Sequence, residues 1–344
     1  MPAIVRAIDV GFGQTKYVTA TRGDVIECAH FPSVTRLHVV DPSDRPALGG
    51  RRRTVLIPIG QLLYEVGHEI HLAGARVGPP LPIEDYVASN EYRALLCGAL
   101  AFMNEPRIDL LVVGLPVSMF AKCKAQLERL ATGEHNLGRA GVVKVESALA
   151  IAQPQGALVT YAMQHDALNA IRQQENLIID AGSRTFDWLV ASGLKLVSNR
   201  SFSAPCGVQD ILRLIAESIS AKIGEAYDDF DAIDLALRKQ KALTLFGESH
   251  PIQRYKPIVD SVAQEAVRAM LSSIGGRYRF ENIVLVGGGA PLFKKAVFSA
   301  FSKQQRIQEV AEPHYANVRG YQRAGMDKMA GRDSEVSAQA RGEQ

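Results

Sequence analysis

The sequence predicts an α/β fold of two lobes in which each lobe carries the same strand–turn–strand hairpin. The length of 344 residues exceeds the usual size of a single hydrophobic core, which favours two lobes. The segment AIDVGFGQTKYVTA (7–20) is followed, 171 positions later (180 minus 9), by the similar segment IIDAGSRTFDWLVA (178–191). A third glycine-rich segment, LVGGGAPL (285–292), joins a strand-like run to a helix-like run. Internal repetition is a primary guide to architecture, and here it indicates a duplicated unit.

The sequence of the first half of the chain predicts strands with helices between them. Residues 4–31 hold three strand-like runs, IVRAIDV, TKYVTA and DVIECAHF, separated by turn residues. Residues 86–103 have helical spacing, and the nearly all-apolar run IDLLVVGLPVS (108–118) is typical of a buried strand. We expect the remaining elements of this half to be a helix, a strand and a second helix, over 119–130, 142–153 and 154–171.

The second half repeats this alternation. Residues 176–201 predict a strand, a glycine turn and a second strand, and amphipathic helices are expected over 208–223 and 257–274. Residues 282–301 predict a buried strand, a glycine loop and a helix. After Met326 the sequence is polar and lacks periodicity, which predicts a disordered tail.

The composition is typical of a soluble protein. Hydrophobic residues make up 47% and charged residues 22% of the chain, and no apolar run approaches the roughly 20 residues of a membrane helix. The start MPAIVRAIDVG lacks the apolar core of a signal peptide, so we expect a cytoplasmic protein without membrane attachment. The cysteines are scattered without CxxC spacing, which argues against a zinc site or a disulfide framework. They are Cys28, Cys97, Cys123 and Cys206.

The charge distribution argues against direct nucleic-acid binding. A net charge of +3 is a slight excess rather than a concentrated basic face. Arg51 to Arg53 are a local exception at the end of a Pro/Gly/Asp-rich segment, and we expect 41–53 to be an exposed loop. These arginines are either solvated, or they contact an acidic partner, DNA or a neighbouring subunit.

The repeated hairpin has the residues of a phosphate clamp. The alignment pairs Asp9 with Asp180, Gly11 with Gly182 and Lys16 with Asp187. Glycines allow backbone N–H groups to approach phosphate oxygens closely, and Lys16 can meet a β- or γ-phosphate. Asp9 and Asp180 can hold Mg²⁺, through water, because that ion keeps much of its hydration shell.

Other phosphate motifs fit this sequence less well. The chain has no GxxxxGK[ST] motif, and neither hairpin runs from a strand straight into a helix. In the third segment, Gly287, Gly288 and Gly289 allow the backbone to lie flat against a ligand ring or ribose.

These three glycine elements, in this order, resemble the actin-like ATPase superfamily. AIDVGFGQTK looks like its first phosphate motif, LIIDAGSRTFDW like its second and VLVGGGAPLF like its adenosine motif. Within the superfamily, LLVVGLPVS and EPHYANVRGYQRAG look most like plasmid-segregation actins of the ParM/StbA type. The resemblance implies an actin-like (duplicated ribonuclease-H-like) two-lobed fold with an interlobe nucleotide cleft. The cofactors implied are ATP (or GTP) and Mg²⁺.

The resemblance also assigns site residues by position. The two phosphate loops consist of Asp9, Gly11, Gly13, Gln14, Thr15 and Lys16, and of Asp180, Gly182, Ser183, Arg184 and Thr185. Gln155 matches the position that orients the attacking water; glutamine has no useful basicity, so slow hydrolysis is expected. Asp187 is either a water-orienting carboxylate or a hairpin-capping residue. CGVQDI places Gly207 and Asp210 beside the nucleotide, although Cys206 stands where the family often has a glycine.

The resemblance divides the chain into a first lobe over 1–160, a second lobe over 161–312, a terminal helix over 313–326 that returns to the first lobe, and the tail. The function implied is that of an ATP-hydrolysing, filament-forming protein for plasmid or DNA segregation, attached to DNA by an adaptor protein. A small-molecule kinase and a nucleotide switch that does not polymerise are the alternatives on the same fold. The kinase would need a carboxylate base acting on a substrate hydroxyl.

Overall fold

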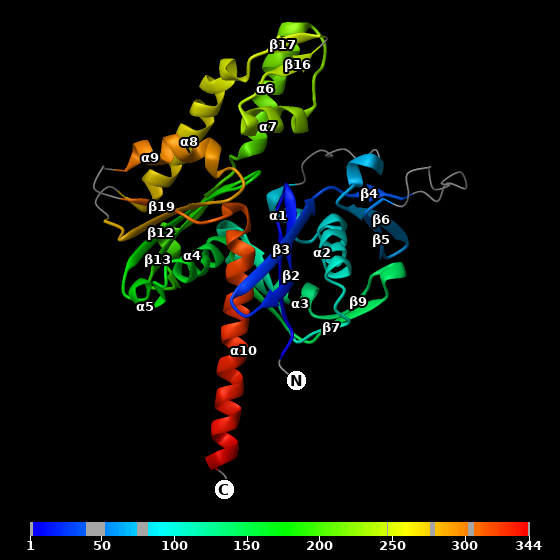
Figure 1. Cartoon of the computed structure of the whole chain (residues 1–344), viewed down its shortest axis with the longest axis vertical. Coiled ribbons are helices and arrows are strands. Elements are labelled where there is room, and N and C mark those ends of the chain that lie inside the picture. The colour runs from blue at the N-terminus through cyan, green and yellow to red at the C-terminus, as the bar shows by residue number, and fades with distance from the viewer. Residues whose placement is uncertain are drawn as a thin grey trace. The chain divides into compact units, whose positions relative to one another are not determined.

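The computed structural model divides the chain into two compact units (Figure 1). Unit 1 consists of Met1–Met163 and Tyr315–Gln344, and unit 2 of Gln164–His314; the sequence-based boundaries lie after residues 160 and 312. The structure describes residues 3–38, 52–73, 82–245, 247–275, 279–301 and 306–342, with side chains up to Gly331.

Unit 1 is built on a five-stranded sheet in the order β11-β8-β1-β2-β3. Its strands are β1 (Val5–Val10), β2 (Gln14–Arg22), β3 (Val25–Pro32), β8 (Leu110–Leu115) and β11 (Ala148–Ala152). The strands β1, β8 and β11 run parallel, whereas β1, β2 and β3 form an antiparallel meander, as the alternating start of the sequence predicts. The apolar strand β8 lies inside the sheet with all six residues buried, because both of its faces are covered.

Two pairs of helices cover the two faces of this sheet. Alternate residues of β1 point to opposite faces: Ile8 packs in a core with α2 (Asn90–Met103) and α3 (Val117–Ala131). Ala7 packs in a second core with Val318 and Tyr321 of α10 (Ala316–Gly342), the red helix of Figure 1. Beside α10 lies α4 (Gln153–Gln164), whose Thr160 hydroxyl donates to the carbonyl of Ala316 at 2.7 Å.

Two small sheets and short helices complete unit 1. One sheet has the order β4-β6-β5 and the other β7-β10-β9. Their strands are β4 (Arg36–Leu37), β5 (Thr54–Ile59), β6 (Leu62–Gly67), β7 (Arg107–Ile108), β9 (Gly133–Asn136) and β10 (Val142–Val145). The short helices are α1 (Ile83–Tyr86), η1 (Ile70–Ala73) and η2 (Gly138–Ala140).

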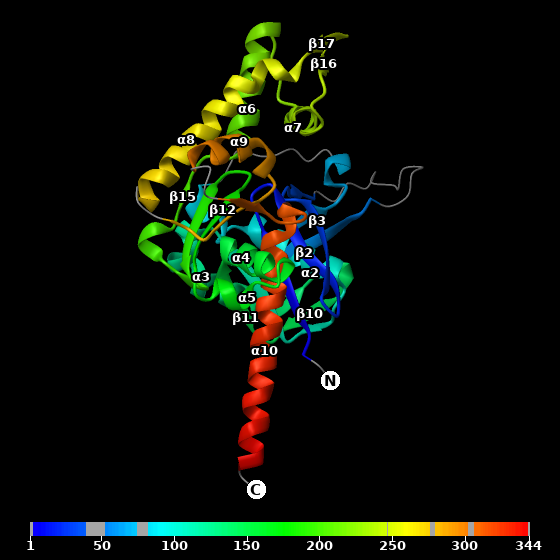
Figure 2. The same ribbon diagram turned by 60° about the vertical axis from the view of Figure 1, so that its left-hand side comes forward.

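Unit 2 is likewise built on a central sheet, which has six strands. Its order is β14-β13-β12-β18-β19, and β15 pairs with β13. The strands are β12 (Glu175–Ala181), β13 (Phe186–Ser192), β14 (Lys195–Leu196), β15 (Phe202–Ala204), β18 (Asn282–Val286) and β19 (Ile307–Glu309). Its helices are α5 (Leu168–Ile171), α6 (Val208–Ile223), α7 (Phe230–Lys239), α8 (Lys256–Ile274) and α9 (Ala290–Ala300), with short turns η3 (Ser198–Arg200) and η4 (Ile252–Tyr255). The short turn η5 (Pro313–Tyr315) spans the boundary with unit 1. Figure 2 shows α6 and α8 side by side, and both belong to the apolar core of this unit.

Three sequence-based expectations need correction. The strand expected over 142–153 is two strands in different sheets, because β10 pairs with β9 whereas β11 pairs with β8. The helix expected over 154–171 ends at Gln164, before Asp166 takes a positive φ of 48°. The tail expected to be disordered from residue 327 belongs to α10, which is helical up to Gly342. Lack of an apolar stripe did not prevent this helix, since the tail contains many good helix formers and no proline.

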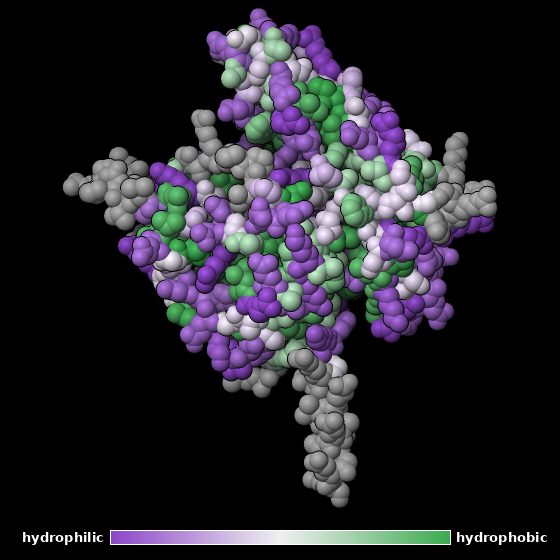
Figure 3. All heavy atoms as spheres, turned by 180° about the vertical axis from the view of Figure 1, so that it is seen from behind, coloured by the Kyte–Doolittle hydropathy of each residue, from purple (hydrophilic) through white to green (hydrophobic). Residues whose placement is uncertain are grey.

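The expected loop over 41–53 falls largely outside the described residues, which omit 39–51. Arg52 and Arg53 are exposed, and Arg52 pairs with Glu65 of β6 at 3.3 Å. In the described part of the chain, no helix is long and apolar enough to cross a membrane. Figure 3 shows hydrophilic side chains spread over one face of the molecule, with smaller apolar patches between them.

Candidate functional site

The first hairpin places Asp9 and Lys16 opposite each other on β1 and β2. The turn between these strands is closed by a hydrogen bond from the N–H of Gly11 to the carbonyl of Gln14 at 3.1 Å. On the far side, the N–H of Ser33 donates to the carbonyl of Gly13 at 3.0 Å. The turn therefore has a fixed shape at the end of a buried strand.

The carboxylate of Asp9 is almost fully buried, with 1% of its surface exposed. One oxygen, Oδ2, lies 3.2 Å from Nζ of Lys16, and the other, Oδ1, accepts from Nε2 of Gln153 at 2.8 Å. A buried carboxylate that keeps its charge needs such partners. Asp9 is thus a fixed anion that orients both a cation and an amide.

Gln153 contacts Asp9, and the sequence analysis did not single it out. The sequence-based candidate, Gln155, uses its amide oxygen to accept from the N–H of Ala152 at 3.2 Å, at the start of α4. Gln153 is buried, with 8% exposed, and it lies directly after β11. The parallel strands β1, β8 and β11 end at the same edge of the sheet, so a polar residue directly after β11 was the available signal.

The second hairpin has the same register, with Asp180 opposite Asp187 on β12 and β13. The N–H of Gly182 donates to the carbonyl of Thr185 at 2.9 Å, which closes this turn like the first one. Asp180 and Asp187 are both buried, with 6% and 1% of their surface exposed. Asp187 is held by the hydroxyl of Ser203 on β15, the neighbouring strand.

The start of α6 packs directly on the second turn. The N–H groups of Val208 and Gln209 donate to the carbonyls of Gly182 and Ser183, at 3.2 Å and 2.8 Å. A Cβ on Gly207 would lie 2.8 Å from the backbone nitrogen of Arg184, so only glycine fits there. Asp210 caps the helix by accepting from the N–H of Gly207 at 2.9 Å. Gly207 and Asp210 are therefore brought to the second turn, where Asp210 has a structural contact.

The third glycine loop follows β18, the parallel neighbour of β12. Gly287 has a positive φ of 93°, and a Cβ there would run into the carboxylate of Asp180 and the backbone of Ala181. The N–H of Gly289 donates to the carbonyl of Ala181 at 2.8 Å. From α7, Nη1 of Arg238 donates to the carbonyl of Gly288 at 2.9 Å. Asp180, the second turn and the glycine loop thus form one assembly within unit 2.

His30 extends the row of polar residues in unit 1. It lies opposite Lys16 on β3, and its Nδ1 is 2.7 Å from the hydroxyl of Tyr315. Burial and the positive charge of Lys16 both lower the pKa of His30 below its ordinary value. His30 is therefore expected to be neutral beside the cation at pH 7.

The residues in these loops suit a nucleotide bound with Mg²⁺. The glycine turns bring backbone close to any bound phosphate, and Lys16 supplies a cation. Among the described residues, no group of three or more His, Cys, Asp or Glu side chains is placed to hold a metal ion by itself. Mg²⁺ typically combines one or two carboxylates with phosphate oxygens and water. Because both oxygens of Asp9 already have partners, that carboxylate fits contact with Mg²⁺ through water.

Comparisons with known proteins agree with this architecture. Two family models match the sequence: the actin like proteins N terminal domain over residues 7–156, and the archaeal actin homologue MreB-like, C-terminal, over residues 178–298. No curated protein matches the sequence.

Several solved structures are similar over nearly the whole chain. Ta0583, an archaeal actin homologue, has a TM-score of 0.76 and 21% identity, over 94% of this chain and 99% of that one. A ParM in a 15-stranded filament from Clostridium botulinum has a TM-score of 0.74 and 19% identity, over 95% and 100%. A non-polymerisable quadruple mutant of pCBH ParM has a TM-score of 0.73 and 19% identity, over 94% and 99%.

At these identities the solved structures establish the fold alone, and one structure of Ta0583 is a complex with ADP. The family models add a relationship in sequence, since one matches the first half of the chain and the other matches the second half. Their matched ranges include the two repeated hairpins and the third glycine loop. This chain has the actin-like fold and belongs to the actin-like superfamily.

Proposed function

We propose that this chain is a filament-forming ATPase that binds ATP with Mg²⁺ through the two hairpin turns and the third glycine loop. The observation that carries this proposal is the repeated hairpin, in which a buried aspartate, Asp9 or Asp180, precedes a closed glycine turn. GTP is the alternative nucleotide.

Each phosphate loop has a distinct task in this proposal. The first loop contacts one side of the phosphates through Gly11, Gly13, Gln14 and Thr15. Lys16 neutralises the charge of the phosphates. The second loop, with Gly182, Ser183, Arg184 and Thr185, contacts the other side. When bound, Mg²⁺ supplies charge neutralisation; Asp9 and Asp180 would hold its waters. The glycine loop at Gly287, Gly288 and Gly289 accepts the nucleoside, and Gly207 and Asp210 support it through α6.

A glutamine amide positions the attacking water in this mechanism. Gln155 is the sequence-based candidate, but the contact between Gln153 and Asp9 favours Gln153. Either amide orients water without removing its proton, so hydrolysis is slow. With Gln153→Ala, we expect phosphate release to fall at least tenfold, and with Gln155→Ala by less than threefold, or ~1.4 against ~0.6 kcal/mol in the barrier. A larger loss of phosphate release with Gln155→Ala than with Gln153→Ala would instead assign the positioning of the water to Gln155. Asp187, held by Ser203, stays a candidate for orienting this water.

Filament formation is proposed from the relatives. One similar ParM is solved as a filament, and another is a mutant described as non-polymerisable. Head-to-tail contacts between copies can extend without closing. The proposed role is plasmid or DNA segregation in the cytoplasm, with a DNA-binding adaptor protein, since a net charge of +3 supports no strong direct DNA contact.

Sedimentation and light scattering test the proposal directly. The purified chain is compared with Mg²⁺-ATP, Mg²⁺-GTP, Mg²⁺-ADP, a slowly hydrolysed ATP analogue and no nucleotide. We expect pelleting only with a triphosphate or the analogue, and loss of pelleting in Asp180→Ala. The matched control is Asp24→Ala, which removes an aspartate that is 91% exposed in its side chain. Nucleotide binding without polymer at any concentration would favour a kinase or a switch instead.

A further inference from the structure

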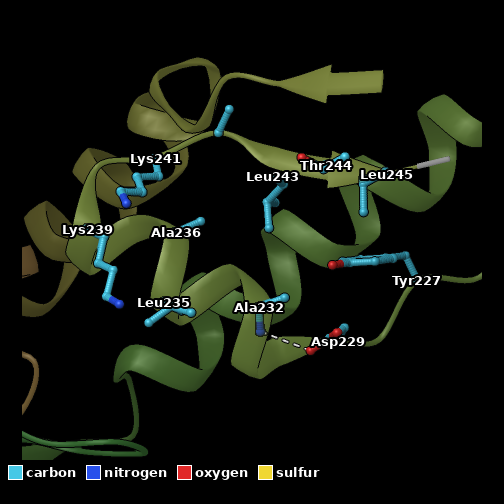
Figure 4. A pocket seen from close by; sticks show the side chains of 11 residues that line it. Tyr227, Asp229, Ala232, Leu235, Ala236, Lys239, Lys241, Leu243, Thr244 and Leu245 are labelled. Atoms are coloured by element: carbon cyan, nitrogen blue, oxygen red, sulfur yellow. Dashed lines mark hydrogen bonds between the residues drawn. The ribbon is translucent and has the colours of Figure 1, made fainter. Parts of the chain in front are cut away.

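Unit 2 carries a groove of about 580 Å³ between α7 and β16 (Leu243–Leu245). Figure 4 shows Leu243 and Leu245 pointing from β16 toward the helix, opposite Ala232 and Ala236. At its rim, Leu235 is 52% exposed. Leu243 and Leu245 are 5% and 8% exposed and belong to the apolar core of unit 2, so Leu235 is the large apolar side chain that the groove leaves exposed.

One wall of the groove is an edge strand. β16 pairs with β17 (Glu248–His250) in a two-stranded sheet, and within the described residues no further strand pairs with β16. The free edge of a short strand can pair with an extended segment of another chain. Thr244, at the middle of β16, is exposed.

The two ends of the groove differ in charge. Figure 4 places Lys239 and Lys241 at one end and Asp229 with Tyr227 at the other. Both lysines are exposed, and neither has an ion-pair partner in the part of the chain that the structure describes. By contrast, the neighbouring Arg238 is bound to Asp234 at 2.7 Å. Asp229 is also occupied, because its carboxylate accepts from the N–H of Ala232 at 2.9 Å.

We propose that this groove docks an extended, acidic segment of a partner protein. The segment adds a strand to the free edge of β16. Its apolar side chains, at alternate positions, face the exposed Leu235 on α7. Its acidic side chains pair with Lys239 and Lys241. The charge difference between the two ends fixes the direction of the segment, since an acidic end placed at Asp229 would be repelled.

Fluorescence anisotropy with synthetic peptides tests this proposal on the full chain without nucleotide. The probes are two fluorescein-labelled heptapeptides of alternating valine and threonine, one with two aspartates at its N-terminal end and one with them at its C-terminal end. We expect one of the two to bind. Lys239→Glu with Lys241→Glu should raise its Kd at least tenfold, or ~1.4 kcal/mol, and a peptide with lysines in place of the aspartates should then bind this variant instead. Lys222→Glu, an exposed lysine on α6, is the matched control and should bind like the wild type.

Hydrogen exchange supplies the readout that is specific for strand pairing. The bound acidic peptide should slow amide exchange in 241–250, and Leu235→Asp, whose folding is checked by its thermal unfolding, should abolish this protection. Equal affinity for the acidic and the lysine peptide, or no binding of either acidic peptide, would overturn the proposal. Protection of 241–250 that rises with protein concentration alone would also overturn it, because a second copy of the chain would then be the occupant.

Discussion

The two hairpins have the same backbone but opposite chemistry along one row of residues. In unit 1 the row across β1, β2 and β3 reads Asp9, Lys16 and His30. In unit 2 the row across β12, β13 and β15 reads Asp180, Asp187 and Ser203. The first aspartate is neutralised by a cation on the next strand, whereas the second faces another carboxylate, which is bound by a hydroxyl.

This difference gives the two copies different chemistry. In the proposed nucleotide site, Lys16 would bind phosphate while sharing its charge with Asp9. The second row carries two carboxylates, and the neighbouring glycine loop is held by a backbone hydrogen bond from Gly289 to Ala181. The duplicated backbone therefore keeps the same closed turn and differs in the side chains around it.

The largest expected effect comes from breaking the first row. Asp9→Ala leaves the ammonium of Lys16 and the amide of Gln153 without their buried partner. Loss of one member of a buried ion pair costs about 3–5 kcal/mol in the free energy of unfolding, because the remaining charge is uncompensated. Urea unfolding measures this loss. Asp24→Ala removes an exposed ion pair with Arg323 and should cost less than about 0.5 kcal/mol. If Asp9→Ala cost no more than this control, the row would have no structural role.

A second prediction concerns the glycine loop of unit 2. Gly287→Ala forces a positive φ on alanine and brings its Cβ against Asp180 and Ala181, so we expect a loss of about 2–3 kcal/mol. The matched control is Gly288→Ala, since no described atom apart from its chain neighbours lies within 4 Å of a Cβ there, and its cost should stay below about 0.5 kcal/mol. Thermal unfolding of both variants gives the comparison. Equal stability of the two variants would contradict the close approach of Gly287 to Asp180.

The third prediction sharpens the contrast between the rows. Ser203→Ala removes the hydroxyl that binds Asp187 inside the sheet, and a hydrogen bond to a charged group contributes about 1.5–3 kcal/mol. We expect a loss near the lower value, because alanine fits a strand without strain. Ser272→Ala removes an exposed helix hydroxyl that donates to Arg268, and should stay within about 0.5 kcal/mol. A neutral result for Ser203→Ala in urea unfolding would mean that Asp187 needs no hydroxyl.

The sequence analysis identified residues that follow one another along a single strand or turn. It missed residues whose place in these rows depends on the pairing between strands. Asp9, Asp180 and the glycine turns could be predicted because repetition and strand periodicity mark them. His30 and Ser203 could not, since their place depends on the ladder register with β2 and β13.

The same limit explains the remaining differences. Gln153 contacts Asp9 because β11 lies in the same sheet as β1, and no local sequence pattern predicts that contact. The groove at α7 depends on a helix and a short hairpin that the sequence analysis did not anticipate. The helix α10 continues to Gly342 because its last residues have good helix propensity, although the apolar periodicity of the sequence ends earlier. The loss of periodicity was therefore the wrong basis for predicting a disordered tail.

The smallest expected effect is a pH dependence from His30 in unit 1. His30 has a lowered pKa in the folded state because of burial and Lys16, so the unfolded chain binds a proton more readily. Stability from this group is complete above the unfolded pKa of about 6.5 and is lost as the pH falls below it. His30→Gln should therefore reduce the loss of stability between pH 7.5 and pH 5.5, measured by urea unfolding. Because Lys16 faces His30 across the ladder, a phosphate bound at Lys16 would offset its charge and weaken this dependence. An unchanged pH dependence in His30→Gln would mean that neither burial nor Lys16 lowers the pKa of His30 in the folded chain.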